Sequence, residues 1–412
     1  MSTQPAKPQK SSSERVRGWS GPAILSYGYR PFFMGAGIWA VLAMLYWIVI
    51  LSNETAYWSL FFPLDWHAHE MLFGYLGAVL AGFLLTAVPN WTGRLPIVGW
   101  PVAALFALWL LGRLAIGVSQ FLSPGIAGVL DLLLPTALTL SIGREIWAGK
   151  NWRNLPLLAL YFLFGVANLV FHVEAALGRV AAEAIGFRLG LGVAVVLLSL
   201  VGGRIIPSFT RNWLVKQRHK ARPAPFNAID RAALAVTLPA LAAWIVWPDH
   251  IGVSYLCAIA GVAHLVRWSR WAGWQTRSEP MLWILHLGYL FVPLGFLAVC
   301  LAGLGVPFSP MIGAQHLWMA GAIGVTSLAI MSRASLAHAG RKPVANRAII
   351  TSYCLVLASV VLRFFAAFGA STGSIMAVSA LLWSTGFLVF TVTYFPILTK
   401  STAKTHRQNR VR

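Results

Sequence analysis

Apolar runs recur along the chain, and short stretches of charged or polar residues separate them. The runs are continuous where the strands of a membrane barrel would alternate, and each is close to the roughly twenty residues with which a helix crosses the hydrocarbon core. Twelve helices are predicted, at residues 32–51, 69–89, 97–118, 124–144, 155–177, 184–206, 228–247, 250–268, 281–303, 310–331, 346–368 and 376–398. The pattern therefore predicts an all-α, polytopic membrane bundle with about 12 transmembrane helices.

Composition agrees with this pattern and excludes an ordinary soluble fold. Of the 412 residues, 58% are hydrophobic and only 10% are charged, and the mean hydropathy is +0.71. The lipid bilayer is therefore the first partner that we expect. Cys257, Cys300 and Cys354 lie inside predicted helices without CxxC spacing, which argues against disulfide or thiolate-metal chemistry.

The positive charge follows the predicted topology. Lys and Arg concentrate in the N-terminal tail, in every second connection and in the C-terminal tail. By the positive-inside rule both termini are cytoplasmic, and the formal charge of +21 mostly reflects topology. Three regions follow: a disordered N-terminal tail (1–30), a twelve-helix transmembrane domain (31–399) and a basic C-terminal tail (400–412). The basic loop 210–223 has almost no interleaved aromatic residues, so no nucleic-acid partner is expected.

Four histidines are expected at a similar depth near the outer face. His67 and His69, in the stretch DWHAHEMLFG, open the second helix, while His172 lies near the outer end of the fifth and His316 in the first turns of the tenth. Ionisable residues in a membrane usually face the bundle interior and mark a functional site. Because neutral imidazole is the commonest metal ligand in proteins, the four histidines are candidate ligands.

Small residues accompany these histidines on their helix faces. Gly313 and Ala320 share the face of His316, and Asn168 shares a stripe of small residues with His172. A flat macrocycle such as haem would fit between such faces, and copper would also accept the imidazoles. Close packing of membrane helices explains the small residues without any cofactor. All three interpretations remain open at this point.

The spacing within DWHAHEMLFG restricts how its two histidines can act. His67 and His69 are two residues apart, so on a helix their side chains would diverge by about 200°. Both can serve one ion only if the helix begins after them. Glu70 then lies in the first turn, where the helix dipole favours its charge, and it could orient a ligating imidazole.

A second set of polar residues is expected toward the cytoplasmic face. His286 and Tyr289 are i, i+3 neighbours and are predicted to form a hydrogen-bonded pair. Arg204, in GGRIIPSFT, lies at membrane depth, and His338 lies near the inner end of the tenth helix. Buried His, Arg and Tyr side chains of this kind would also suit a secondary transporter that carries protons or an anion.

Five segments of the chain resemble those of the NnrS family. They are SYGYRPFFMGAG, WHAHEMLFGYLGAVLAGFLLTAVPNWTG, GGRIIPSFT, LHLGY and QHLWMAGAIGVTSLAIMSRASLAHAGR, in this order over nearly the whole membrane domain. The resemblance implies a bacterial inner-membrane protein that contains haem, of b type, and copper, and that serves nitric oxide metabolism, denitrification or the nitrosative-stress response. The resemblance does not say which residues bind iron and which bind copper. The residues of this chain that match the family's motif positions are His67, His69, His172, Arg204, His286, His316 and His338.

Two functions from different classes remain. In the first, the protein binds haem and copper and binds, senses or detoxifies nitric oxide or iron-nitrosyl species. In the second, it is a proton- or anion-coupled transporter. The chain has neither an adjacent His-His pair nor an HxxxY motif, so any likeness to haem-copper oxidases concerns the number of spans, and no catalytic residue is assigned.

Overall fold

The computed structural model describes residues 18–52, 57–92, 96–307, 310–368 and 372–400, and within them every regular element is a helix. The α-helices and two π-helical segments are α2 (Tyr29–Leu51), α3 (Pro63–His69), η2 (Glu70–Tyr75), α4 (Leu76–Thr92), α5 (Trp100–Gly117), α6 (Pro124–Ala148), α7 (Leu155–Ala176), α8 (Ile185–Lys216), α9 (Ala228–Val246), α10 (Ile251–Ser269), α11 (Pro280–Gly303), α12 (Met311–His316), η7 (Leu317–Val325), α13 (Thr326–His338), α14 (Arg347–Phe365) and α15 (Thr372–Thr399). Short 3₁₀ turns are η1 (Ala23–Ser26), η3 (Ser119–Phe121), η4 (Trp152–Asn154), η5 (Ala181–Glu183) and η6 (Gly273–Thr276).

Twelve helices in the described residues are long and apolar enough to cross a membrane, which confirms the predicted fold class of a multi-pass membrane protein. The second span is composite and consists of α3, η2 and α4, and the tenth consists of α12, η7 and α13. Residues 1–17 and 401–412 of the two predicted tails lie outside the described residues.

Three spans differ clearly in length from the prediction. The second begins at Pro63 and not at residue 69, because proline is tolerated in the first turn of a helix, where its missing N–H would have no partner. The sixth continues through Pro207 to Lys216, and the tenth continues to His338. These inner extensions carry polar residues, so hydropathy alone placed their ends too early.

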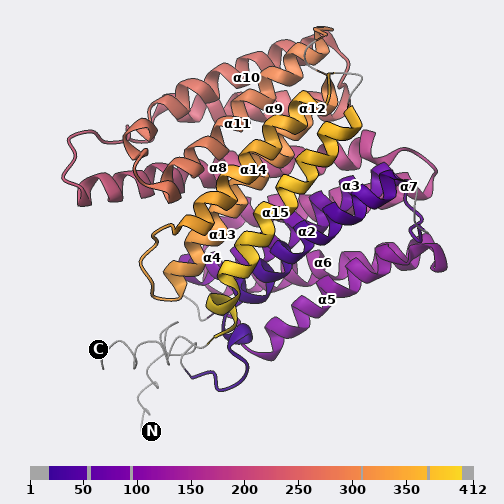
Figure 1. Cartoon of the computed structure of the whole chain (residues 1–412), viewed down its shortest axis with the longest axis horizontal. Coiled ribbons are helices and arrows are strands. Elements are labelled where there is room, and N and C mark those ends of the chain that lie inside the picture. The colour runs from indigo at the N-terminus through magenta and orange to yellow at the C-terminus, as the bar shows by residue number, and fades with distance from the viewer. Residues whose placement is uncertain (1–17, 53–56, 93–95, 308–309, 369–371, 401–412) are drawn as a thin grey trace, which may run out of the picture.

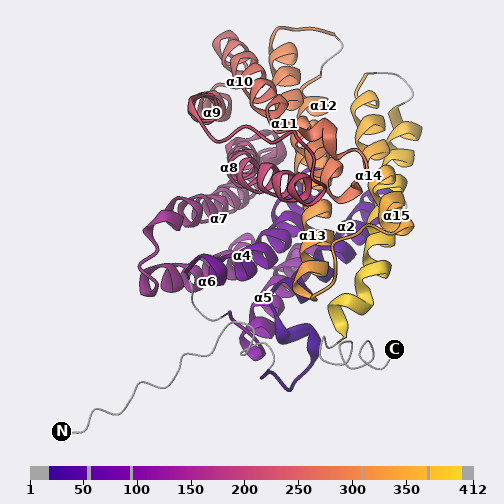
Figure 2. The ribbon, with the colours of Figure 1, turned by 90° about the vertical axis from the view of Figure 1, so that its left-hand side faces the viewer.

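Four spans form the centre of the bundle. The buried share of the most apolar stretch is 83% in the second span, 67% in the sixth, 67% in the ninth and 72% in the tenth, whereas it is between 33% and 39% in the other eight. The second, sixth, ninth and tenth spans (α4, α8, α11 and α13) run through the middle of the molecule, with α5 and α6 on one side and α9 and α10 on the other (Figures 1 and 2). Side chains that project from these central helices can therefore line an interior site.

The start of the first span and the end of the last span lie together at one end of the bundle. The last helix, α15, packs along the first, α2, so that the yellow and indigo ribbons lie side by side (Figure 1). Arg30 Nη1 donates hydrogen bonds to the carbonyl oxygens of Leu398, at 3.2 Å, and Lys400, at 2.9 Å. An even number of spans requires the first span to begin on the side where the last one ends, and the start of α2 and the end of α15 do lie together.

Both composite spans contain a π-helical segment that directly follows a histidine. The segment η2 begins after His69, and η7 begins after His316. A π-helix inserts an extra residue into the turn, changes the direction of the following side chains and occurs frequently at functional sites. The two interruptions thus coincide with the outer histidines that the sequence singled out.

Candidate functional site

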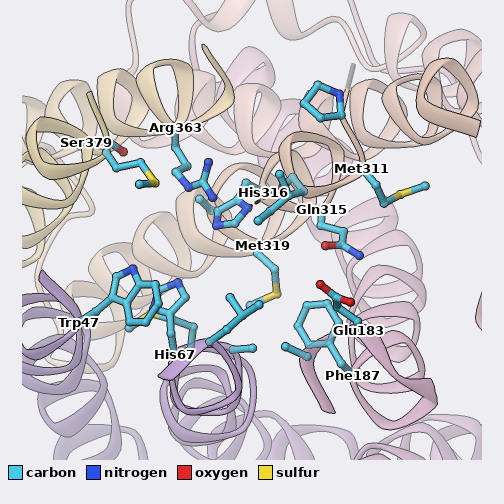
Figure 3. Close-up of a pocket in the computed structure, with 18 of the residues that line it drawn as sticks. Trp47, His67, Glu183, Phe187, Met311, Gln315, His316, Met319, Arg363 and Ser379 are labelled. Atoms are coloured by element: carbon cyan, nitrogen blue, oxygen red, sulfur yellow. Dashed lines mark hydrogen bonds between the residues drawn. The ribbon is translucent and has the colours of Figure 1, made fainter. Parts of the chain in front are cut away.

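A cavity of about 1020 Å³ lies between the two composite spans. His67 and Met71 line it from the second span, and His316 and Met319 line it from the tenth (Figure 3). Other walls come from α2, α8, α14 and α15, together with connections beyond α9 and α11. Ligand sites in proteins commonly have volumes of about 300–1,000 Å³ and mostly apolar walls with a few polar groups, so this cavity is large enough for a macrocycle.

His316 presents a defined nitrogen to this cavity. Its Nδ1 lies 2.7 Å from the carbonyl oxygen of Ile312, one turn earlier in α12. Because a carbonyl oxygen only accepts, Nδ1 donates its proton and Nε2 keeps its lone pair. Metal-binding histidines are typically oriented in this way, by a backbone carbonyl on the nitrogen that does not bind the metal.

His67 lies across the cavity from His316, beside Trp47 (Figure 3). The His67 and Trp47 rings stack with their centroids 4.5 Å apart and their planes within 18°. His67 Nδ1 is buried, and no described residue forms a hydrogen bond to it. Since a buried polar nitrogen without a partner is costly, this atom is available to a ligand.

A separate polar cluster surrounds Asp131 on α6. Its Oδ2 lies 3.1 Å from His69 Nε2 and 3.1 Å from His172 Nε2, and it accepts a hydrogen bond of 2.7 Å from Asn168 Nδ2. His69, Asp131 and His172 are all buried, and each offers one possible ligand atom to a metal ion. These three atoms lie within 4.8 Å of one another. Two imidazoles and a carboxylate form a donor set that suits iron, copper or zinc.

Two further charges complete this cluster. Arg113 on α5 donates from Nη1 to both carboxylate oxygens of Glu70, at 2.6 Å, and from Nη2 to Asp131 Oδ1. Glu70 Oε1 lies 3.1 Å from His69 Nδ1, and Glu70 Oε2 accepts a hydrogen bond of 2.8 Å from Trp39 Nε1. If His69 donates Nδ1–H to Glu70, its Nε2 lone pair faces the oxygens of Asp131 and Asn168, and a cation between them would stabilise these acceptors.

Glycines leave the room that this cluster needs. A Cβ at Gly74, within η2, would lie 2.5 Å from Arg113 Nη1 and 2.6 Å from Glu70 Oε2. A Cβ at Gly112 would lie 2.8 Å from Asp131 Oδ1. Neither contact is sterically tolerable, so the ion pairs depend on the absence of side chains at these positions.

The space beside the cluster decides what it can hold. A void of about 20 Å³ touches Arg113, Asp131 and Asn168. This is close to the volume of one water molecule and far too small for a macrocycle. The cluster therefore fits a single ion at most, whereas the large cavity fits an organic cofactor.

The four outer histidines thus divide into two pairs. His69 and His172 meet edge to face with ring centroids 5.2 Å apart, while His67 and His316 line the cavity. Since α3 starts before His67, both histidines of the second span are helical, and their side chains diverge as the spacing predicts. Glu70 Oε1 lies 3.1 Å from His69 Nδ1 and Asn168 Oδ1 lies 3.0 Å from His69 Nε2, so both residues can orient this ring.

The predicted pair of His286 and Tyr289 is wrong. The Tyr289 hydroxyl lies 2.8 Å from His264 Nδ1 and accepts a hydrogen bond of 3.0 Å from Arg267, while His286 Nε2 lies 2.8 Å from Thr210 Oγ1. Neighbours at i, i+3 share a helix face, but each side chain here finds a closer partner on another helix. These residues form polar contacts in the half of the bundle that was predicted to face the cytoplasm.

Arg204 and His338 lie away from both sites. The side chain of Arg204 is exposed on α8 and does not line the cavity. His338, the last residue of α13, is also exposed and packs its ring near Tyr27 and Tyr29, with centroids 5.5 and 5.4 Å away. Tyr27 precedes the first span, and burial raises the pKa of its phenol, which therefore stays protonated at neutral pH.

Four charged residues of the two sites lie inside predicted spans but were not singled out from the sequence. They are Arg113 on α5, Asp131 on α6, Arg188 on α8 and Arg363 on α14. The usable signal was simply a charge within an apolar run, which is rare and usually functional.

A comparison with known protein families places the chain in one of them. Residues 23–401, nearly the whole chain, match the family model described as NnrS protein. No curated protein matches the chain. The match covers both composite spans and every residue of the two sites described above, and the chain belongs to the NnrS family.

Proposed function

We propose that this protein is a haem- and copper-binding bacterial inner-membrane protein of nitric oxide metabolism, acting in denitrification or the nitrosative-stress response. Membership of the NnrS family supports the link to nitric oxide. The observation that carries the proposal is the cavity, with an oriented imidazole on one wall and a buried, unpartnered imidazole nitrogen on another. Nitric oxide or an iron-nitrosyl species is the expected ligand.

Haem, of b type, is assigned to the cavity because the cavity has room for a macrocycle and the void beside the ion cluster does not. His316 Nε2 would hold the iron, with His67 as the second candidate ligand. Bound haem would supply an iron atom that can coordinate nitric oxide. The chain itself orients His316 through the Ile312 carbonyl, restrains the His67 ring against Trp47 and surrounds the site with apolar side chains that limit access of water.

Copper is assigned to the cluster of His69, Asp131 and His172. Imidazole and carboxylate donors suit copper, and Glu70 on His69 Nδ1 would fix the orientation of that ring. Arg113 offsets the charge of the two carboxylates, so a bound cation would not have to neutralise both. This division assigns the two metals to different sides of the second span.

Optical spectra and metal analysis of four variants test the assignment. We expect His316→Ala and His67→Ala to lose the Soret band of the purified wild type, and His69→Ala and His172→Ala to keep the Soret band but lose copper. Addition of nitric oxide should shift the band in wild type. A colourless, metal-free wild type from haem-replete cells would overturn the proposal, and full haem retention in all four variants would remove the cavity as the haem site.

A transporter is the second candidate, and one observation favours it. Discontinuous helices line the central sites of many secondary transporters, and here both interrupted spans face one cavity. Proton-coupled uptake of an anion into metal-free proteoliposomes, lost on His316→Ala, would favour transport over the haem proposal.

A further inference from the structure

The guanidinium of Arg363 has no partner in the described part of the chain. Arg363 lies in the last turn of α14 and lines the cavity, and its side chain extends toward His316 (Figure 3). No hydrogen bond or ion pair joins it to any other described residue. The guanidinium carries five N–H donors in a planar fork, so most of its hydrogen-bonding capacity is unused.

The other guanidinium on the cavity wall provides a useful contrast. Arg188 on α8 donates from Nε to the Ile245 carbonyl, at 2.9 Å, and from Nη1 to the Glu183 carbonyl. Asp249 and Glu183 also line the cavity, and Asp249 contributes an attractive charge to Arg188. Arg188 therefore has acceptors from the chain itself, and Arg363 does not.

Two ordinary explanations account for Arg363 only in part. An arginine in the last turn of a helix interacts favourably with the helix dipole, and long basic side chains near helix ends extend toward water. Positive residues are nevertheless disfavoured on the predicted outer side, where α14 ends. The side chain also extends into the cavity toward an imidazole and not outward along the helix surface.

We propose that Arg363 binds an anionic oxygen group of the molecule that occupies the cavity. The inference rests on the proposed function only in using the same cavity. Planar guanidinium groups bind carboxylates and oxyanions through paired N–H donors, and this preference excludes a neutral diatomic gas as the sole ligand. Two sources share this chemistry: the carboxylate of a haem propionate, and a free small oxyanion such as nitrite.

The test uses haem-depleted, detergent-solubilised full-length protein. Haem, haem dimethyl ester and sodium nitrite are titrated separately, and binding is followed by tryptophan fluorescence, because Trp47, Trp244 and Trp383 line the cavity. The variants are Arg363→Gln and Arg363→Lys. Arg231→Gln, an exposed arginine in the first turn of α9 away from the cavity, is the matched control.

If a propionate is the anion, wild type and Arg231→Gln bind haem roughly 10- to 100-fold more tightly than its dimethyl ester, and Arg363→Gln loses this preference. Arg363→Lys retains part of it. If a small oxyanion is the ligand, nitrite binds to wild type and not to Arg363→Gln, and haem and its ester bind alike. Nitrite binding that is lost in Arg363→Gln, in a protein that binds neither haem nor its ester, would support the role of Arg363 while rejecting the haem proposal. The inference would be overturned if the protein bound haem but Arg363→Gln changed neither the preference for haem over its dimethyl ester nor the binding of nitrite. The haem proposal would then remain intact.

Discussion

At the scale of single residues, the molecule places full charges where lipid-facing helices would carry none. Arg113, Glu70 and Asp131 are 5% exposed or less, and each makes at least two polar contacts. Burial of such groups is tolerable only when every partner is present. The sequence indicated Glu70 through its expected position at a helix start, but its partners Arg113 and Trp39 lie 43 and 31 residues away along the chain, beyond any local pattern.

Asp131→Asn should strongly destabilise the protein. The change leaves Arg113 with one carboxylate and weakens the contacts to His69 and His172. Removing one partner of a buried ion pair typically costs about 3–5 kcal/mol. Unfolding in mixed detergent micelles, followed by circular dichroism, measures the loss.

A double variant tests whether the loss comes from the ion pair. Adding Arg113→Gln to Asp131→Asn should cost less stability than the sum of the two single variants, because the contact between residues 113 and 131 can be lost only once. Arg144→Gln, which breaks an ion pair whose arginine side chain is 74% exposed, should change the free energy of unfolding by less than about 1 kcal/mol. Equal effects of Asp131→Asn and Arg144→Gln would contradict this account of the cluster.

At the scale of secondary structure, hydropathy predicted the spans well and their interruptions not at all. A helix length and an apolar composition are local properties, so twelve segments could be found one by one. A π-helical turn has no comparable signature, because the extra residue is accommodated by what surrounds it. In η2 the surroundings are Arg113 and Trp39, which occupy the space above Gly74.

Gly74→Ala should disrupt the cluster, whereas Gly77→Ala, three residues later, should not. The new methyl group at residue 74 would overlap Arg113 Nη1, and a Cβ at Gly77 meets no atom within 4 Å. Alanine at residue 77 should even stabilise the helix by up to about 1 kcal/mol. Thermal unfolding and copper content of the two variants provide the comparison, and equal behaviour would mean that the space above η2 is not needed.

At the scale of the whole molecule, the arrangement of spans decides which residues can share a site. The sequence grouped the four outer histidines as one set, but it could not show that they divide between a cavity and an ion cluster. That division depends on which faces of eight different spans meet around the cavity. For Arg204, the sequence predicted a position at membrane depth. It could not predict that the side chain is exposed on the surface of the bundle.

The orientation of the bundle is a separate prediction. In a variant with Cys257, Cys300 and Cys354 replaced by alanine, Arg179→Cys in the connection after α7 should react with a membrane-impermeant maleimide in intact cells. Lys220→Cys, in the basic connection after α8, should react only after permeabilisation. The reverse pattern would place both termini outside and the cavity at the cytoplasmic face.

The contact between α2 and α15 bears on how the protein matures. The cavity wall includes Trp47 from the first span and Trp383 from the last, so no nascent chain can form it until synthesis is complete. A cofactor that occupies this cavity would then have to enter a bundle that is already inserted in the bilayer. Its binding would be a late, post-translational event and would report that the last span has taken its place.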